Sequence, residues 1–208
     1  MKKALRKPPG TYHHGNLRRA LLDAGLGLIE RSGPDALTLR EVARRAGVSQ
    51  TAPYRHFEHK EALVAAVAEE GLRDLTEWLR LAAAKAPDPV RAFADMGVAY
   101  VRFANAHPAH FRVMFGPGAP DRARHPSLRA ADAAAHAQLV TVIEAGQRSG
   151  DIVATDAREL ALGAWSLVHG LASLLAGGQL AGRNAPARTP ARLAKIVTRT
   201  FFLGAGVR

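Results

Sequence analysis

The side chains best suited to bind another molecule lie between residues 49 and 60, in the segment SQTAPYRHFEHK. Short hydroxyl and amide groups come first, and a phenol and several basic groups follow. Hydroxyl and amide groups can pair with base edges, whereas basic groups and phenols can contact phosphates. The segment therefore predicts a nucleic-acid contact with these candidates: Ser49, Gln50, Thr51, Tyr54, Arg55, His56 and Lys60.

The charge of the chain also points to an anionic partner. The formal net charge is +11 and the pI is near 11.0. Residues 1–60 hold 12 basic and 5 acidic residues, which gives +7 of that total. Such a concentration is typical of a nucleic-acid-binding surface, whereas an arginine-rich composition explains the other +4. Residues 1–11 are expected to form a flexible basic arm, which either enters a minor groove or acts as a non-specific counter-charge.

Two short helices joined by a glycine are expected to position the segment. Thr38 and Glu41 have the spacing of a capping box, in which each side chain satisfies a free backbone N–H group, so a helix should begin there. Gly47 then supplies the turn, and Ser49 caps a third helix that carries the segment as far as Phe57.

A helix pair joined by a tight glycine turn is what a helix-turn-helix requires. The third helix is then expected in the major groove, with Thr38 and Arg40 adding to the DNA contact. Phe57 is expected in the core, whereas Tyr54 either contacts phosphate or packs in the core as well. Pro53 removes one early backbone N–H group, so the first turn of the third helix is expected to be distorted.

The whole chain is expected to be all-α, because Ala, Leu and Arg are abundant while β-branched and aromatic residues are scarce. Helical periodicity and capping residues predict helices at 16–31, 38–46, 49–57, 58–84, 88–106, 108–115, 127–148, 156–181 and 190–205. The predicted organisation is the arm at 1–11, a DNA-binding domain at 12–60, a connecting helix at 61–86 and a larger helical domain at 87–208.

The front of the chain resembles a known family. The stretch YHHGNL from Tyr12, followed by LTLREVARRAGVSQTAPYRHFEHKEAL, is similar to the N-terminal DNA-binding domain of the TetR family of one-component bacterial regulators. A dozen positions agree in identity and spacing, including the pattern V-S-x-x-x-x-Y-x-H-F-x-x-K-E-x-L from Val48 to Leu63. Pro53 departs from the family pattern, which has Leu or Ala there in many members.

A weaker resemblance extends to the second half. HPAHFRVMF at 107–115 and WSLVHG at 165–170 look like a TetR C-terminal domain type with a Trp-x-x-x-His-Gly sequence in its penultimate helix. This resemblance implies a ligand-sensing and dimerisation domain, with a homodimer formed through the last two helices. It also implies a DNA-binding repressor rather than an enzyme.

A small, apolar ligand is the expected partner of that domain. Trp165 and His169 are four residues apart on one helical face, and other aromatic and sulfur-containing side chains could join them in an apolar pocket with one polar handle. The candidate pocket residues are Phe103, His107, Phe111, Met114, Trp165 and His169. A packed core with a hydrogen-bonded histidine is the alternative for each of them.

Metal and cofactor chemistry finds no support in the sequence. The chain has no cysteine, no HExxH sequence and no histidine–carboxylate set with ligand spacing, and its nine histidines suit caps, pocket linings and surfaces. Phosphate loops, dinucleotide fingerprints and nucleophile–base motifs are also missing. The sequence therefore predicts no metal, no cofactor and no catalysis, and a helical ligand-binding enzyme would need a catalytic pair that the sequence does not supply.

A cytoplasmic location without a membrane partner is expected. The basic N-terminus lacks the apolar stretch of a signal peptide, and the missing cysteines fit a reducing compartment. Residues 160–179 are uncharged over the length of a membrane span. Four glycines dilute their hydrophobicity and no aromatic or basic belt brackets them, so a buried helix is favoured.

These features predict a repressor that binds a palindromic double-stranded operator as a homodimer. A ligand in the second domain would favour a conformer that no longer fits the operator, with the connecting helix at 61–86 as the lever. The alternative is a nonspecific architectural protein that uses charge alone.

Overall fold

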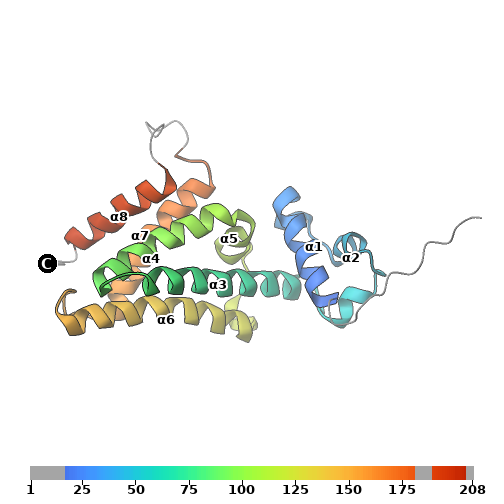
Figure 1. The fold of residues 1–208 in the computed structure, drawn as a ribbon. Coiled ribbons are helices and arrows are strands. Elements are labelled where there is room, and N and C mark those ends of the chain that lie inside the picture. Colours follow the sequence, from blue (N-terminus) through green and yellow to red (C-terminus); the bar gives the residue numbers. More distant parts are fainter. Residues whose placement is uncertain (1–16, 181–188, 205–208) are drawn as a thin grey trace, which may run out of the picture. The chain divides into compact units, whose positions relative to one another are not determined.

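The computed structural model describes residues 17–180 and 189–204, and its described part contains helices and no strand (Figure 1). The expected all-α class is therefore confirmed. The predicted basic arm lies outside the described residues. The α-helices are α1 (Leu17–Ser32), α2 (Leu39–Ala46), α3 (Lys60–Ala84), α4 (Pro89–Ala106), α5 (Pro108–Phe115), α6 (Pro126–Ser149), α7 (Ala157–Ala176) and α8 (Pro190–Gly204). Three short 3₁₀ helices accompany them: η2 (Pro34–Ala36), η3 (Ala52–Arg55) and η4 (Arg122–Arg124).

Capping side chains set the ends of several helices. The Asp88 carboxylate accepts a hydrogen bond from the first turn of α4, and the Asp156 carboxylate accepts two from the first turn of α7. α7 ends at Ala176, five residues before the predicted end at 181. Gly177 and Gly178 explain the difference, because Gly178 has a left-handed φ of 66° and helix propagation through two glycines is unfavourable.

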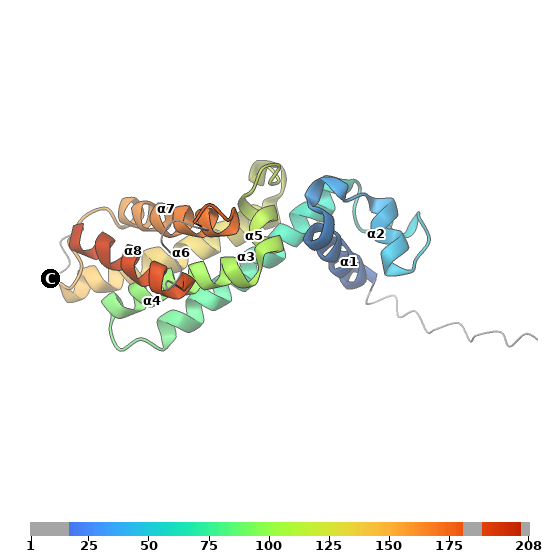
Figure 2. The same ribbon diagram turned by 90° about the horizontal axis from the view of Figure 1, so that it is seen from above.

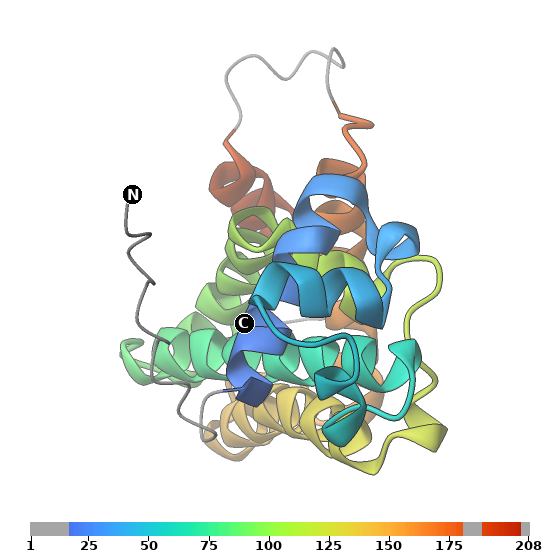
Figure 3. The ribbon, with the colours of Figure 1, turned by 90° about the vertical axis from the view of Figure 1, so that its right-hand side faces the viewer.

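The chain forms two compact units, Met1–Leu63 and Val64–Arg208, so that the boundary falls inside α3. In the first unit α1 and α2 pack against each other (Figure 3). Their core includes Leu21, Ile29 and Val42, all of which are fully buried. Phe57 is also buried, so its predicted place in the core is confirmed.

The second unit is a bundle around α4, which packs against α6, α7 and α8 (Figure 2). Its core includes Phe93, Ile143 and Ile152. α5 lies against α3 at Gly71, where a Cβ atom would stand 2.7 Å from the Met114 Sδ atom and 3.1 Å from the Cβ atom of His110. A side chain at residue 71 would require Met114 and His110 to shift, so the glycine favours this close approach of the two helices.

α7 is a helix long and apolar enough to cross a membrane, judged by length and composition among the described residues. The same properties fit the inner helix of a bundle, and α7 packs against α4, α6 and α8. Yet only 28% of its most apolar 18-residue stretch is buried, so much of this apolar helix is accessible, either at the surface or in a cavity of the bundle.

Candidate nucleic-acid interface and ligand cavity

α2 and the turn after it follow the sequence closely. The Thr38 Oγ1 atom accepts a hydrogen bond from the Glu41 N–H group at 3.2 Å, as a helix cap should. Gly47 ends the helix in the left-handed region with a φ of 70°, and the Val48 N–H group donates to the Ala43 carbonyl. The predicted cap and glycine turn are thus present.

The second half of the predicted capping box is wrong. The Glu41 carboxylate accepts hydrogen bonds from the guanidinium groups of Arg44, at 2.6 and 2.8 Å, and Arg45. These bonds, above all that from Arg44, lower the pKa of Glu41 to about 2. The carboxylate is therefore held by two cations of its own helix, which leaves it unavailable to the backbone at Thr38.

The third helix also differs from the prediction. Instead of an α-helix over 49–57 the structure has the 3₁₀ helix η3, preceded by a turn in which the Ala52 N–H group donates to the Ser49 carbonyl. Pro53 explains this, because it has no N–H group to donate and disfavours the α conformation of the residue before it. Ser49 does not act as a side-chain cap, since its hydroxyl lies 3.2 Å from the Thr51 hydroxyl.

All of the candidate DNA-contact residues are exposed. They are Thr38, Arg40, Ser49, Gln50, Thr51, Tyr54, Arg55, His56 and Lys60. The side chain of Tyr54 is 54% exposed, which rules out its alternative place in the core. An exposed phenol beside basic groups is suited to phosphate contact.

The basic groups of this surface differ in how far they are already neutralised. Arg44 and Arg45 pair with Glu41, whereas within the described residues no ion pair involves Arg40 or Arg55. The Lys60 ammonium donates to the Asp35 carbonyl at 3.2 Å, which positions it without neutralising its charge. Arg40, Arg55 and Lys60 therefore supply the surface with full positive charges.

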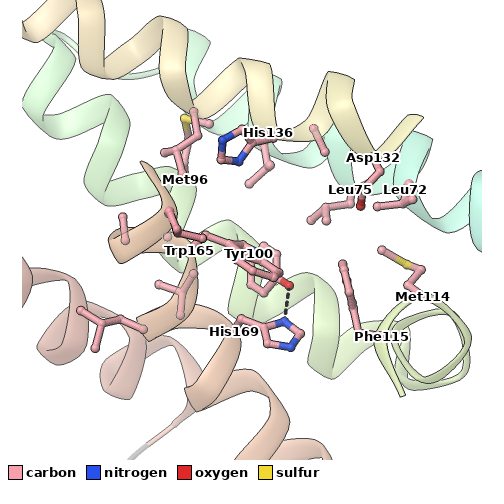
Figure 4. Close-up of a pocket in the computed structure, with 18 of the residues that line it drawn as sticks. Leu72, Leu75, Met96, Tyr100, Met114, Phe115, Asp132, His136, Trp165 and His169 are labelled. Atoms are coloured by element: carbon pink, nitrogen blue, oxygen red, sulfur yellow. Dashed lines mark hydrogen bonds between the residues drawn. The ribbon is translucent and has the colours of Figure 1, made fainter. Parts of the chain in front are cut away.

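The second unit contains a cavity of about 530 Å³ (Figure 4). Its walls are mainly aliphatic and aromatic, and this volume falls in the range of small-molecule sites. Its lining includes Leu72 and Leu75 of α3, Met96 and Tyr100 of α4, Met114 and Phe115 of α5, Asp132 and His136 of α6, Trp165 and His169 of α7 and Thr198 of α8.

Three of the six predicted pocket residues line this cavity, namely Met114, Trp165 and His169. The other three pack elsewhere. The rings of Phe103 and Phe111 are buried in the protein core, and His107 sits between α4 and α5 against the rings of Phe103 and Trp78. The spacing of residues along a helix shows which side chains share a face. It does not show which of the aromatic side chains line a cavity and which pack between helices.

Tyr100 lies beside the histidine of the Trp-x-x-x-His sequence. Burial raises the pKa of its phenol, an effect that Trp165 partly offsets, and burial lowers the pKa of His169. The phenol therefore keeps its proton and lies 2.8 Å from the His169 Nδ1 atom. A phenol can donate or accept, so the direction of this hydrogen bond follows from which imidazole nitrogen carries the proton.

The lowered pKa of His169 predicts a pH effect on stability. The unfolded chain takes up a proton near the ordinary pKa of 6.5, and the folded chain resists it, so the free energy of unfolding should fall as the pH drops below 6.5. Urea titrations of the His169→Gln variant should show a weaker pH dependence in that range than the unmodified chain. His56→Gln is the control for loss of an exposed imidazole, and equal slopes for His169→Gln and the unmodified chain would contradict the assignment.

An ion pair lies in the cavity wall. The Arg122 Nε atom is 3.1 Å from the Asp132 carboxylate, and Nη2 of the same guanidinium donates to the Met114 carbonyl at 3.1 Å. The guanidinium also stands over the Phe115 ring, 5.7 Å from its centroid. No sequence pattern marked Tyr100, Arg122, Asp132 and Thr198 as cavity residues, because only the packing of the helices brings them together.

The structure also groups three potential metal ligands that the spacing of histidines and carboxylates did not reveal. One ligand atom each of Glu70, Asp74 and His110 lies within 4.8 Å of the others. Glu70 and Asp74 are one turn apart on α3, whereas His110 comes from α5. The contact between these helices at Gly71 brings the imidazole to the carboxylates.

Two family models match the chain. Residues 21–67 match the model described as bacterial regulatory proteins, tetR family, and residues 93–201 match that described as tetracyclin repressor-like, C-terminal domain. The second match covers just over half of the 208 residues.

Relatives and solved structures agree with these matches. The tetracycline repressor protein class A from transposon 1721 of Escherichia coli is 35% identical over 142 residues, which cover 64% of this chain and 57% of that protein. A protein of unknown function from Rhodococcus sp. RHA1 has 36% identity and a TM-score of 0.81, covering 96% of this chain and 100% of its own. The regulator FadR from Bacillus subtilis, solved with stearoyl-CoA, shares the fold at 14% identity and a TM-score of 0.73, with 88% and 96% covered.

Proposed function

Since the chain belongs to the TetR family of bacterial regulatory proteins, we propose that it is a cytoplasmic repressor that binds a palindromic operator as a homodimer and releases it when a ligand fills the cavity. The observation that carries this proposal is the exposed surface at 49–60. It presents hydroxyl and amide side chains suited to base edges beside Arg55 and Lys60, which form no ion pair within the described part of the chain. Two copies of a short recognition element suit half-sites about one helical turn apart.

The homodimer is supported by the outward faces of the last two helices. Leu174 of α7 and Ile196 of α8 are 40% and 43% exposed, and neither lines the cavity. Gly170 of α7 also has open space at its Cβ position. Exposed apolar side chains gathered on neighbouring helices are typical of a protein–protein contact.

Ligand control is supported by the cavity. It is largely apolar, and its walls include α3, the helix whose first turn belongs to the DNA-binding unit. A ligand acts only through its different affinities for the two conformers, so an occupied cavity must disfavour the one that fits the operator.

Selection of bound fragments from a random duplex library tests the operator. An enriched inverted repeat that is bound about a thousandfold more tightly than random DNA would support the proposal. Enrichment of no sequence, with affinity that falls equally everywhere as salt rises, would contradict it and indicate a nonspecific architectural protein instead.

Arg55→Ala tests the contact surface itself. We expect weaker binding to every sequence and a reduction of about one in the slope of log affinity against log salt, because one phosphate contact is lost. The control is Arg44→Ala, which removes a guanidinium that already pairs with Glu41 and should therefore change both quantities less. Equal effects of the two substitutions would contradict the assignment of Arg55.

A further inference from the structure

Thr198 of α8 is an unusual residue in the wall of the cavity. It is 7% exposed, and its hydroxyl oxygen is buried without a hydrogen-bond partner among the described residues. Buried hydroxyl groups normally have a partner, because an unpaired one keeps the cost of leaving water. The hydroxyl of Thr198 is therefore a buried polar group of the wall whose hydrogen bonding the described residues leave unsatisfied.

The helical backbone does not force this arrangement. Thr76, Thr141 and Thr200 lie inside helices too, and each donates its hydroxyl to the carbonyl four residues earlier, at 2.8, 2.9 and 3.0 Å. Thr198 departs from this pattern. Its Oγ1 atom instead lies beside Gly97 of α4, where a Cβ atom would come within 2.8 Å of it, and Gly97 lines the same cavity. Because Gly97 has no side chain, the Thr198 hydroxyl has room beside α4 in the cavity wall.

The charges of the wall restrict what the partner can be. Its one carboxylate and one guanidinium, Asp132 and Arg122, already pair with each other. A charged ligand would lose its hydration without finding an unpaired counter-ion, which is unfavourable in an apolar site. The other titratable groups of the wall are the phenol of Tyr100, which burial keeps protonated by raising its pKa, and the imidazoles of His136 and His169.

We propose that the cavity takes an uncharged, mainly apolar molecule whose hydroxyl or carbonyl group pairs with Thr198. This inference rests on the proposed ligand-controlled repressor, and it adds the chemical class of the ligand and the residue that distinguishes it. The apolar walls bind the body of the molecule, and Thr198 recognises its single polar group.

A matched set of ten-carbon probes tests the charge preference. Displacement of Nile red from the full chain at pH 7.5 is measured with 1-decanol, decanoate and decylammonium, each below its solubility limit. We expect 1-decanol to bind at least about tenfold more tightly than either ion, because only the ions lose a charge–water interaction. Equal or tighter binding of decanoate or decylammonium would overturn the proposal, as would no displacement by 1-decanol.

Thr198→Val tests the contact, since valine keeps the shape and removes the hydroxyl. We expect the affinity for 1-decanol to fall about five- to tenfold, and the Tm of the ligand-free protein to rise by about 2–4 °C because an unpaired buried hydroxyl is gone. The control is Thr200→Val, on the same helix but exposed and bonded to the Ile196 carbonyl, which should leave the 1-decanol affinity unchanged. Unchanged affinity in Thr198→Val would overturn the assignment.

Operator release is measured separately on the selected DNA. Binding of 1-decanol that depends on Thr198 supports the ligand class even if the operator stays bound, and in that case the proposed ligand control fails alone. If only decanoate releases the operator, the proposed ligand-controlled repressor is supported and the proposed uncharged ligand class is overturned.

Discussion

Replacing Leu174 and Ile196 together with glutamate should turn the protein into a monomer and lower its operator affinity at least about a hundredfold. Both side chains are about two-fifths exposed, one on α7 and one on α8, and neither lines the cavity. Glutamate at these positions would place four carboxylates in the apolar contact of a dimer. A monomer holds only one half-site, so the gain from binding two linked half-sites is lost, and that gain is on the order of 10² to 10⁴.

Sedimentation velocity and operator titration at fixed salt would measure the two effects. The control is Leu81→Glu, because Leu81 is 42% exposed but lies on α3, outside the proposed contact. It should remain a dimer and keep its operator affinity. A dimeric double variant with full affinity would contradict the assignment of α7 and α8 to the interface.

Phe103→Ala should lower the free energy of unfolding by about 3–5 kcal/mol, the usual cost of removing a buried phenylalanine. The ring is 1% exposed and packs edge-on against Trp78, with centroids 5.8 Å apart. It does not line the cavity, so the substitution leaves an empty space in the core between α3 and α4.

Urea denaturation at fixed protein concentration measures this loss, with Leu81→Ala as the exposed control, for which a change within about 0.5 kcal/mol is expected. A loss of less than about 1 kcal/mol for Phe103→Ala would mean that the ring borders open space after all. The sequence prediction that it lines the pocket would then be favoured over the position described above.

Local rules in the sequence predicted the ends of α2 well. The cap at Thr38 and the turn at Gly47 depend on neighbouring residues alone, and both are present. The predicted type of the third helix was wrong. Pro53 disfavours an α-helix there despite the helical spacing of the residues around it, so a 3₁₀ helix forms. The candidate side chains are nevertheless exposed on this 3₁₀ helix and the turn before it.

The cavity was less predictable, for a physical reason. Trp165 and His169 share one helix face, so their spacing was informative, but their partner Tyr100 lies 69 residues before His169 in an apolar helix where nothing marks it. The sequence does not mark Thr198 either, because its distinguishing feature is a buried hydroxyl without a hydrogen-bond partner among the described residues. Such features exist only once α4, α7 and α8 have packed.

The contact at Gly71 has a mechanical consequence. With no side chain at this point, Met114 and His110 of α5 rest almost directly on the backbone of α3, and no compressible layer separates the two helices. Met114 also lines the cavity, and α3 continues without a break to Lys60. Under the proposed ligand control, a molecule that displaced Met114 would therefore act on the backbone of α3 directly, because no side chain at residue 71 separates the two helices.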